Sequence, residues 1–250
     1  MQTQQNRKGM FTSKMKLADV VQANFNTLSV INRFDIKLGF GDLSVEKVCA
    51  INGVNPDFFL EILNAFNDTN YFPQKHLQSF SVAEIVGYLR RTHQDYMHQN
   101  IPYIESLLEL LESDCAKPDE IMLVHNFFNE YKVELFKHLQ WEDEKIFPYA
   151  QNVEQAYLQS YNVDETMRAI TEYSMSNFLD EHDDIESKLN DINTLFVKYL
   201  PPVGNQRLCI RILREFFVLQ RDIYDHSRIE EKVLAPKVME MEKQLLNQHE

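Results

Sequence analysis

Four histidines recur along the chain at nearly equal intervals. The steps between them are 45, 44 and 44 residues, and the four are His93, His138, His182 and His226. Such a step fits a helix of roughly twenty residues, a turn, and a similar helix running back. In a bundle of antiparallel helices it returns each histidine to the same height. The spacing therefore predicts a layer of four imidazoles across the core of a helical bundle.

Two of these histidines also open a repeated motif. His138 begins HLQWEDEKIFP and His226 begins HSRIEEKVLAP, and both follow the pattern H-x3-E-x5-P. Glu142 and Glu230 each stand four residues after their histidine, on the same helical face. Imidazole suits iron, zinc and copper, and a carboxylate can bridge two cations. Four imidazoles and two carboxylates at one level predict a site for two metal ions, roughly 3.5–4 Å apart.

These residues also allow other interpretations. A single histidine on an apolar stripe is more often a hydrogen-bonded core residue than a ligand, but four at one level with a duplicated motif favour metal. Glu134 and Asp222 each precede a candidate histidine by four residues and could orient its ring, with solvation as an equal alternative. Glu186 follows His182 by four residues without the later proline, and is interpreted as a carboxylate outside the ligand set.

Two other types of metal site do not fit the pattern. Structural zinc sites normally use cysteine, and the three cysteines of this chain are widely spaced. Ferritin-type sites place a Glu three residues before a His on two helices. In this chain those positions are occupied by Arg90, Leu135, Leu179 and Ile223.

Composition places the chain in the all-α class. It has 250 residues, 44% of them apolar, with only six glycines and almost no strand-like alternation. The net charge of −13 argues against nucleic acid as a partner. Three unpaired cysteines suit a reducing compartment, and neither a secretory signal nor a long apolar run appears. We therefore expect a cytoplasmic protein that does not associate with a membrane.

Hydrophobic periodicity predicts two domains. The expected architecture is an up-down-up-down four-helix bundle preceded by a small helical N-terminal domain. Residues 1–15 are expected to be a disordered tail, 16–67 the small domain, 68–80 a linker and 81–250 the bundle. Four long helices are expected near residues 81–112, 118–149, 164–199 and 205–246, the first kinked at Pro102. A domain of about 50 residues is marginal alone, so docking or a homodimer is expected.

The stretches RRTHQDYMHQNIPYI, HLQWEDEKIFP, FLDEHDDIE and HSRIEEKVLAP resemble the hemerythrin-like HHE cation-binding domain. Their order, H…HxxxE…H…HxxxE, resembles the bacterial iron–sulfur cluster repair (RIC) di-iron proteins. The resemblance implies ligation by His93, His138, Glu142, His182, His226 and Glu230. It further implies two iron ions, as Fe2+ or Fe3+, with an oxo or hydroxo group as a candidate bridge between them.

The N-terminal segment resembles the small helical domain of the same family. That domain carries a Cys-Cys pair in a stretch of the type GIDFCCGG, where this chain has FDIKLGFGDLS. Gly39 and Phe40 replace the two cysteines, so no thiol chemistry is expected there. The resemblance implies repair of damaged Fe–S proteins under nitrosative or oxidative stress, with NO, O2 or peroxide as small ligands. A hemerythrin-like module that binds or senses O2 or NO without turnover remains the alternative.

Overall fold

The computed structural model describes residues 9–114, 118–181, 185–199 and 205–248. Across these ranges the regular structure is helical, which confirms the all-α class, and the isolated bridge between Lys16 and Ser44 is not extended into a strand. The chain divides into two compact units, Met1–Ser81 and Val82–Glu250. Within the described ranges, no helix combines the length and the apolar character needed to cross a membrane.

The first unit is built from short helices around a small apolar core. Asn55 starts its longest helix, because its side chain accepts hydrogen bonds from the backbone N–H groups of Asp57 and Phe58. Phe11 lies in the segment expected to be a tail, yet it is only 8% exposed. Its backbone N–H donates to Oδ1 of the buried Asn64, and its carbonyl accepts from Nδ2 of the same side chain. The helices of this unit are α1 (Leu17–Ala23), α2 (Thr27–Arg33), α3 (Val45–Ile51), α4 (Pro56–Asn67) and α5 (Gln74–Leu77).

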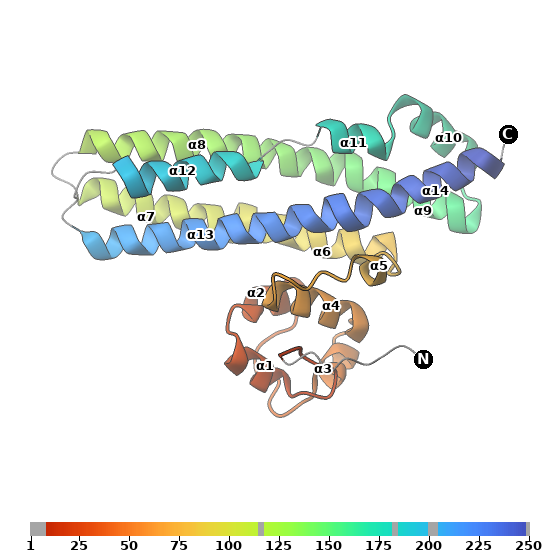
Figure 1. The fold of residues 1–250 in the computed structure, drawn as a ribbon, viewed down its shortest axis with the longest axis horizontal. Helices are drawn as coiled ribbons and strands as arrows, with labels where there is room; N and C mark the ends of the chain where they lie inside the picture. Colours follow the sequence, from red (N-terminus) through yellow and green to blue (C-terminus); the bar gives the residue numbers. More distant parts are fainter. Residues whose placement is uncertain (1–8, 115–117, 182–184, 200–204, 249–250) are drawn as a thin grey trace. The chain divides into compact units, whose positions relative to one another are not determined.

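The second unit is an elongated helical bundle (Figure 1). In one half, four helices pack in a closed ring in which each contacts the next: α7 with α8, α8 with α12, α12 with α13, and α13 with α7. Their facing sides bury a continuous apolar core that includes Phe128, Leu189 and Phe216. The bounds of these helices are α7 (Ile101–Ser113), α8 (Pro118–Trp141), α12 (Ile185–Tyr199) and α13 (Gln206–Ile229).

The other half of the bundle continues three of these helices and adds two short ones. Here α9 packs against both α6 and α14, and α10 and α11 pack against α14. The helices are α6 (Val82–Asp95), α9 (Phe147–Gln159), α10 (Val163–Glu172), α11 (Met175–Glu181) and α14 (Ala235–Gln248). The two halves of the bundle meet at the level where the candidate metal ligands lie.

Three π-helical turns join the halves of the long helices. They are η1 (Tyr96–Asn100), η2 (Glu142–Ile146) and η3 (Glu230–Leu234). Each is followed by a helix whose second residue is a proline, namely Pro102, Pro148 or Pro236. Proline has no N–H to donate, and its ring crowds the carbonyl four residues earlier. A π turn has hydrogen bonds that reach five residues back, so it can accommodate both the missing donor and the steric crowding. Such turns are frequent at functional sites, and Glu142 and Glu230 are each the first residue of one.

The third long helix expected from the sequence, near residues 164–199, is broken. The break lies at Tyr173, whose backbone is extended (φ −156°, ψ 110°) and ends α10. Met175 then starts α11, with its backbone N–H bonded to Glu242 Oε1 of α14 at 2.9 Å. The prediction of one continuous helix was wrong because a carboxylate from a distant helix supplies the acceptor that lets a new helix begin here.

Candidate metal centre

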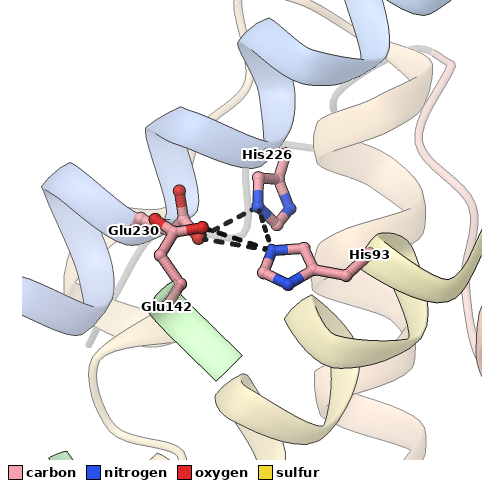
Figure 2. Close-up of side chains that lie close together, drawn as sticks. All are labelled: His93, Glu142, His226 and Glu230. Carbon is pink, nitrogen blue, oxygen red and sulfur yellow. Dashed lines mark hydrogen bonds and ion pairs between the residues drawn. The ribbon is translucent and has the colours of Figure 1, made fainter. Parts of the chain in front are cut away.

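Four of the six predicted ligands converge in the core of the bundle. His93 comes from the last turn of α6 and His226 from the last turn of α13, while Glu142 and Glu230 open the π turns η2 and η3. Their exposed fractions are 0% for His93 and Glu142, 6% for His226 and 1% for Glu230. One ligand atom from each lies within 4.8 Å of all the others, and Figure 2 shows the four side chains directed at one another.

The two imidazoles face each other through the same ring atom. His93 Nε2 and His226 Nε2 lie 3.0 Å apart, and the ring centroids lie 4.8 Å apart. At this distance at most one of the two nitrogens carries a proton between them, so the other presents a lone pair. Converging lone pairs of this kind suit a shared cation, because a cation accepts electron density from both nitrogens at once.

The two carboxylates complete the group. Glu230 Oε1 lies 2.9 Å from His226 Nε2 and 3.9 Å from His93 Nε2. Glu142 Oε2 lies 3.5 Å from His93 Nε2. Two almost fully buried carboxylates in one small volume are costly to desolvate unless positive charge accompanies them. The donor set of two imidazole nitrogens and two carboxylates therefore fits a divalent or trivalent metal ion.

His138 extends the group on its far side. Its side chain is 10% exposed, and its Nε2 lies 3.3 Å from Glu142 Oε1. The two oxygens of Glu142 thus face different imidazoles, one from α6 and one from its own helix. This is the arrangement that a carboxylate bridging two cations requires. His182, the sixth predicted ligand, lies outside the described residues.

Two buried aromatic rings contact the imidazoles of the group. Phe147, which is fully buried, stacks on His93 with ring centroids 5.3 Å apart and an interplanar angle of 25°. Tyr96, also fully buried, lies edge-on to His226 at 5.8 Å. Low polarity around charged ligands strengthens their interaction with a cation. These rings were not predicted as part of the site, although Tyr96 opens a π turn six residues before a proline, as both glutamates do.

One carboxylate at the site was missed by the sequence analysis. Asp143, next to Glu142 on η2, places Oδ1 3.3 Å from Nδ1 of His93 on another helix. Of the two candidates for orienting a histidine, Glu134 is instead ion-paired with Lys188 at the surface, and Asp222 is 7% exposed. The side chain of Glu186 lies outside the described residues. No spacing within one helix could have connected Asp143 with His93, because the contact joins two helices.

The fold and the site together define a class of protein: an all-α bundle with a buried His–Glu group that fits a metal ion. Comparison with protein families gives the family. Residues 85–238, more than half of the chain, match the hemerythrin HHE cation binding domain, and the chain belongs to that family. The comparisons with curated proteins and with solved structures gave no match.

Proposed function

We propose that this chain is a non-haem di-iron protein of the iron–sulfur cluster repair type, acting in the response to nitrosative or oxidative stress. The observation that carries the proposal is the buried group of His93, His226, Glu142 and Glu230 within 4.8 Å, extended by His138 on the second oxygen of Glu142. The family match supports a metal-binding protein. The repair role is supported by the order of the six ligand types along the sequence.

The proposed ligands divide between two ions. His93 and His226 would hold one ion, and His138 with His182 would hold the other. Glu142 would bridge them, as its oxygens already face His93 and His138 at 3.5 and 3.3 Å, and Glu230 would be the second bridge. Two bridging carboxylates offset part of the positive charge of the pair, so that the low-polarity core can contain it. When bound, two redox-active ions with unfilled positions supply a place where NO, O2 or peroxide can bind and exchange electrons.

The residues of the chain have defined tasks in this proposal. The imidazoles of His93, His138 and His226 would donate Nε2 lone pairs, and the carboxylates would supply negative charge. Phe147 stacks on the His93 ring and Tyr96 lies edge-on to the His226 ring, so both help to fix these imidazoles. The partners we propose are a small diatomic ligand or peroxide and damaged Fe–S proteins in the cytoplasm. Cys49 and Cys209 are both buried and neither forms a disulfide, which suits the reducing compartment that such a role needs.

The alternative function is a hemerythrin-like module that binds or senses O2 or NO without turnover. The loop that resembles the family's Cys-Cys stretch favours it, because Gly39 and Phe40 stand where the thiols would be. Gly39 has φ +99°, a backbone conformation that glycine adopts readily and a cysteine would not. Any repair chemistry in this chain must therefore proceed without thiols in that loop.

One experiment separates these functions. The full chain is purified with and without oxygen, its metals are measured, and its absorption spectrum is recorded with and without NO. The iron-loaded protein is then added to an Fe–S enzyme damaged by NO or peroxide. Two irons per chain and restored enzyme activity support repair, whereas two irons with NO or O2 binding and no restoration support the sensing function. A chain that binds fewer than one iron overturns both.

A further inference from the structure

We propose that Asp143 is the positioning residue that fixes the tautomer and ring orientation of His93. With the proton held on Nδ1, Nε2 of His93 keeps a lone pair that is directed at the metal centre. The inference rests on the proposed function in that it treats His93 as a ligand. It adds a residue to the site that the pattern of four histidines and two glutamates does not contain. It also assigns a distinct part to each of two adjacent carboxylates, Glu142 and Asp143.

The contact itself is specific. Asp143 Oδ1 lies 3.3 Å from His93 Nδ1, on the side of the ring opposite the metal group. Both atoms are shielded from solvent, and neither makes a hydrogen bond to any other group in the described part of the chain. Buried polar atoms of this kind need a partner, and each is the nearest partner available to the other. A proton on Nδ1 satisfies both atoms and leaves Nε2 as an acceptor.

Arg90 holds the carboxylate in place from outside. It lies one turn before His93 on α6, and one of its terminal nitrogens donates to the backbone carbonyl of Asp143 at 3.1 Å. Its Nε lies 3.6 Å from Asp143 Oδ1, and its guanidinium stands over the Phe147 ring at 5.9 Å. Because Phe147 also stacks on His93, the ring of His93 is fixed on one face by an aromatic ring and on one edge by Asp143.

The second copy of the motif lacks this arrangement. Glu231 occupies the position after Glu230 that Asp143 occupies after Glu142, but Glu231 is exposed to solvent, whereas the side chain of Asp143 is 23% exposed. The two copies of the H-x3-E motif therefore differ in the described part of the chain: the copy on α8 and η2 places its next carboxylate beside the ligand histidine of another helix, and the matching residue of the other copy is exposed. We therefore expect the ring orientation of His93 to be more firmly fixed than that of His226.

The tautomer provides a test that needs no metal. In the metal-free, 15N-histidine-labelled full chain, two-bond 1H–15N correlation spectra distinguish a protonated ring nitrogen from one that carries a lone pair. We expect His93 to be protonated at Nδ1 and to accept at Nε2. Asp143→Ala should shift the population toward the Nε2-protonated form, and Asp143→Asn, which retains an oxygen acceptor, should restore much of the original state.

The matched control is Glu144→Ala. Glu144 lies on the same π turn, is exposed, and accepts a hydrogen bond from the Gln140 side chain at 2.8 Å. It should leave the His93 tautomer unchanged. In the iron-loaded chain, release of iron to a chelator should be about tenfold faster for Asp143→Ala than for Glu144→Ala, since removing the outer partner of a ligand histidine typically costs 10–100-fold in metal affinity.

The outcomes are distinct from those for the proposed function. A wild-type His93 protonated at Nε2, or equal iron release from Asp143→Ala and Glu144→Ala, would overturn the role of Asp143 even if the chain holds two irons. A wild-type chain that binds no iron would overturn the proposed function, and the tautomer spectra would still decide whether Asp143 sets the state of His93. Circular dichroism melting of each metal-free variant checks that the bundle has folded.

Discussion

Two pairs of buried glutamates lie in the same bundle and are held in different ways. Glu142 and Glu230, at the candidate metal centre, face imidazole nitrogens at 2.9–3.9 Å. Glu154 and Glu242, in the half formed by α6, α9, α11 and α14, face backbone N–H groups instead. Glu154 Oε1 accepts from Val82 at 2.7 Å, and Glu242 Oε1 accepts from Met175 at 2.9 Å and from the Tyr149 hydroxyl.

The difference shows that burial alone does not mark a metal ligand. All four carboxylates are at most 9% exposed. Val82 and Met175 are the first residues of α6 and α11, so Glu154 and Glu242 satisfy N–H groups that a helix leaves open at its start and complement its dipole there. The carboxylates at the centre lie among imidazoles that can themselves act as ligands. The partner of a buried carboxylate, rather than its depth, separates a structural role from a candidate metal-binding one.

The largest effect expected from this comparison concerns the glutamates of the centre. Glu142→Ala and Glu230→Ala should each lower the metal content of the chain and the melting temperature measured with metal present. Metal bound only to the folded state adds about 4 kcal/mol when the free metal is a thousand times its Kd, and the variants lose most of this contribution. With a chelator present, wild type and variants should melt at similar temperatures. Full metal content and an unchanged melting temperature would show that these residues are not ligands.

The next effect concerns Glu242 and should not depend on metal. Glu242→Ala removes the acceptor for the Met175 N–H and the Tyr149 O–H, and each buried donor left without a partner costs about 1–3 kcal/mol. Urea unfolding should show this loss equally with and without metal. Glu240→Ala, an exposed change on the same helix, is the control. A loss seen only in the metal-loaded protein would mean that Glu242 acts through the centre.

A smaller effect is expected at Glu154. Glu154→Ala removes the carboxylate that accepts the Val82 N–H, and the loss of a helix N-terminal acceptor costs about 1 kcal/mol. It should also lower the pKa of Lys237 further. Burial already lowers that pKa, and the nearby Glu154 and Glu84 carboxylates oppose the shift. NMR titration of the Lys237 ammonium in the wild type and the variant measures this; an unchanged pKa would show that Glu154 and Lys237 do not interact.

The smallest effect lies in the first unit, at the buried thiol of Cys49. Burial raises the pKa of the Cys49 thiol from 9.0 to about 11. The raised value means that the folded state retains the proton after the unfolded chain has lost it. The contribution of the neutral Cys49 thiol to the free energy of unfolding is therefore complete below pH 9. It is lost as the pH rises to about 11. Urea unfolding from pH 8 to 11 should show this decline, and Cys49→Ala should reduce it. An equal decline in both proteins would contradict the assignment.

Much of the site could be predicted because its key relations are local. A helix places residues four apart on one face, and the pairs His138–Glu142 and His226–Glu230 indeed lie at 3.3 and 2.9 Å. The near-equal spacing of the histidines indicated that His93 and His226, 133 residues apart, share one level, and their Nε2 atoms lie 3.0 Å apart. Helix length and turn length are properties of short stretches, so a regular repeat carries this information across the chain.

Three features were decided only by the tertiary structure. The prolines of the two motifs were visible in the sequence. The π turns before them, however, also keep Glu142 and Glu230 in the core while the following helix packs in the other half of the bundle. The break at Tyr173 depends on Glu242 meeting the N–H of Met175. The contact between Asp143 and His93 joins two helices. In the last two cases the partners are distant in sequence, and no local preference determines which side chain a neighbouring helix will supply.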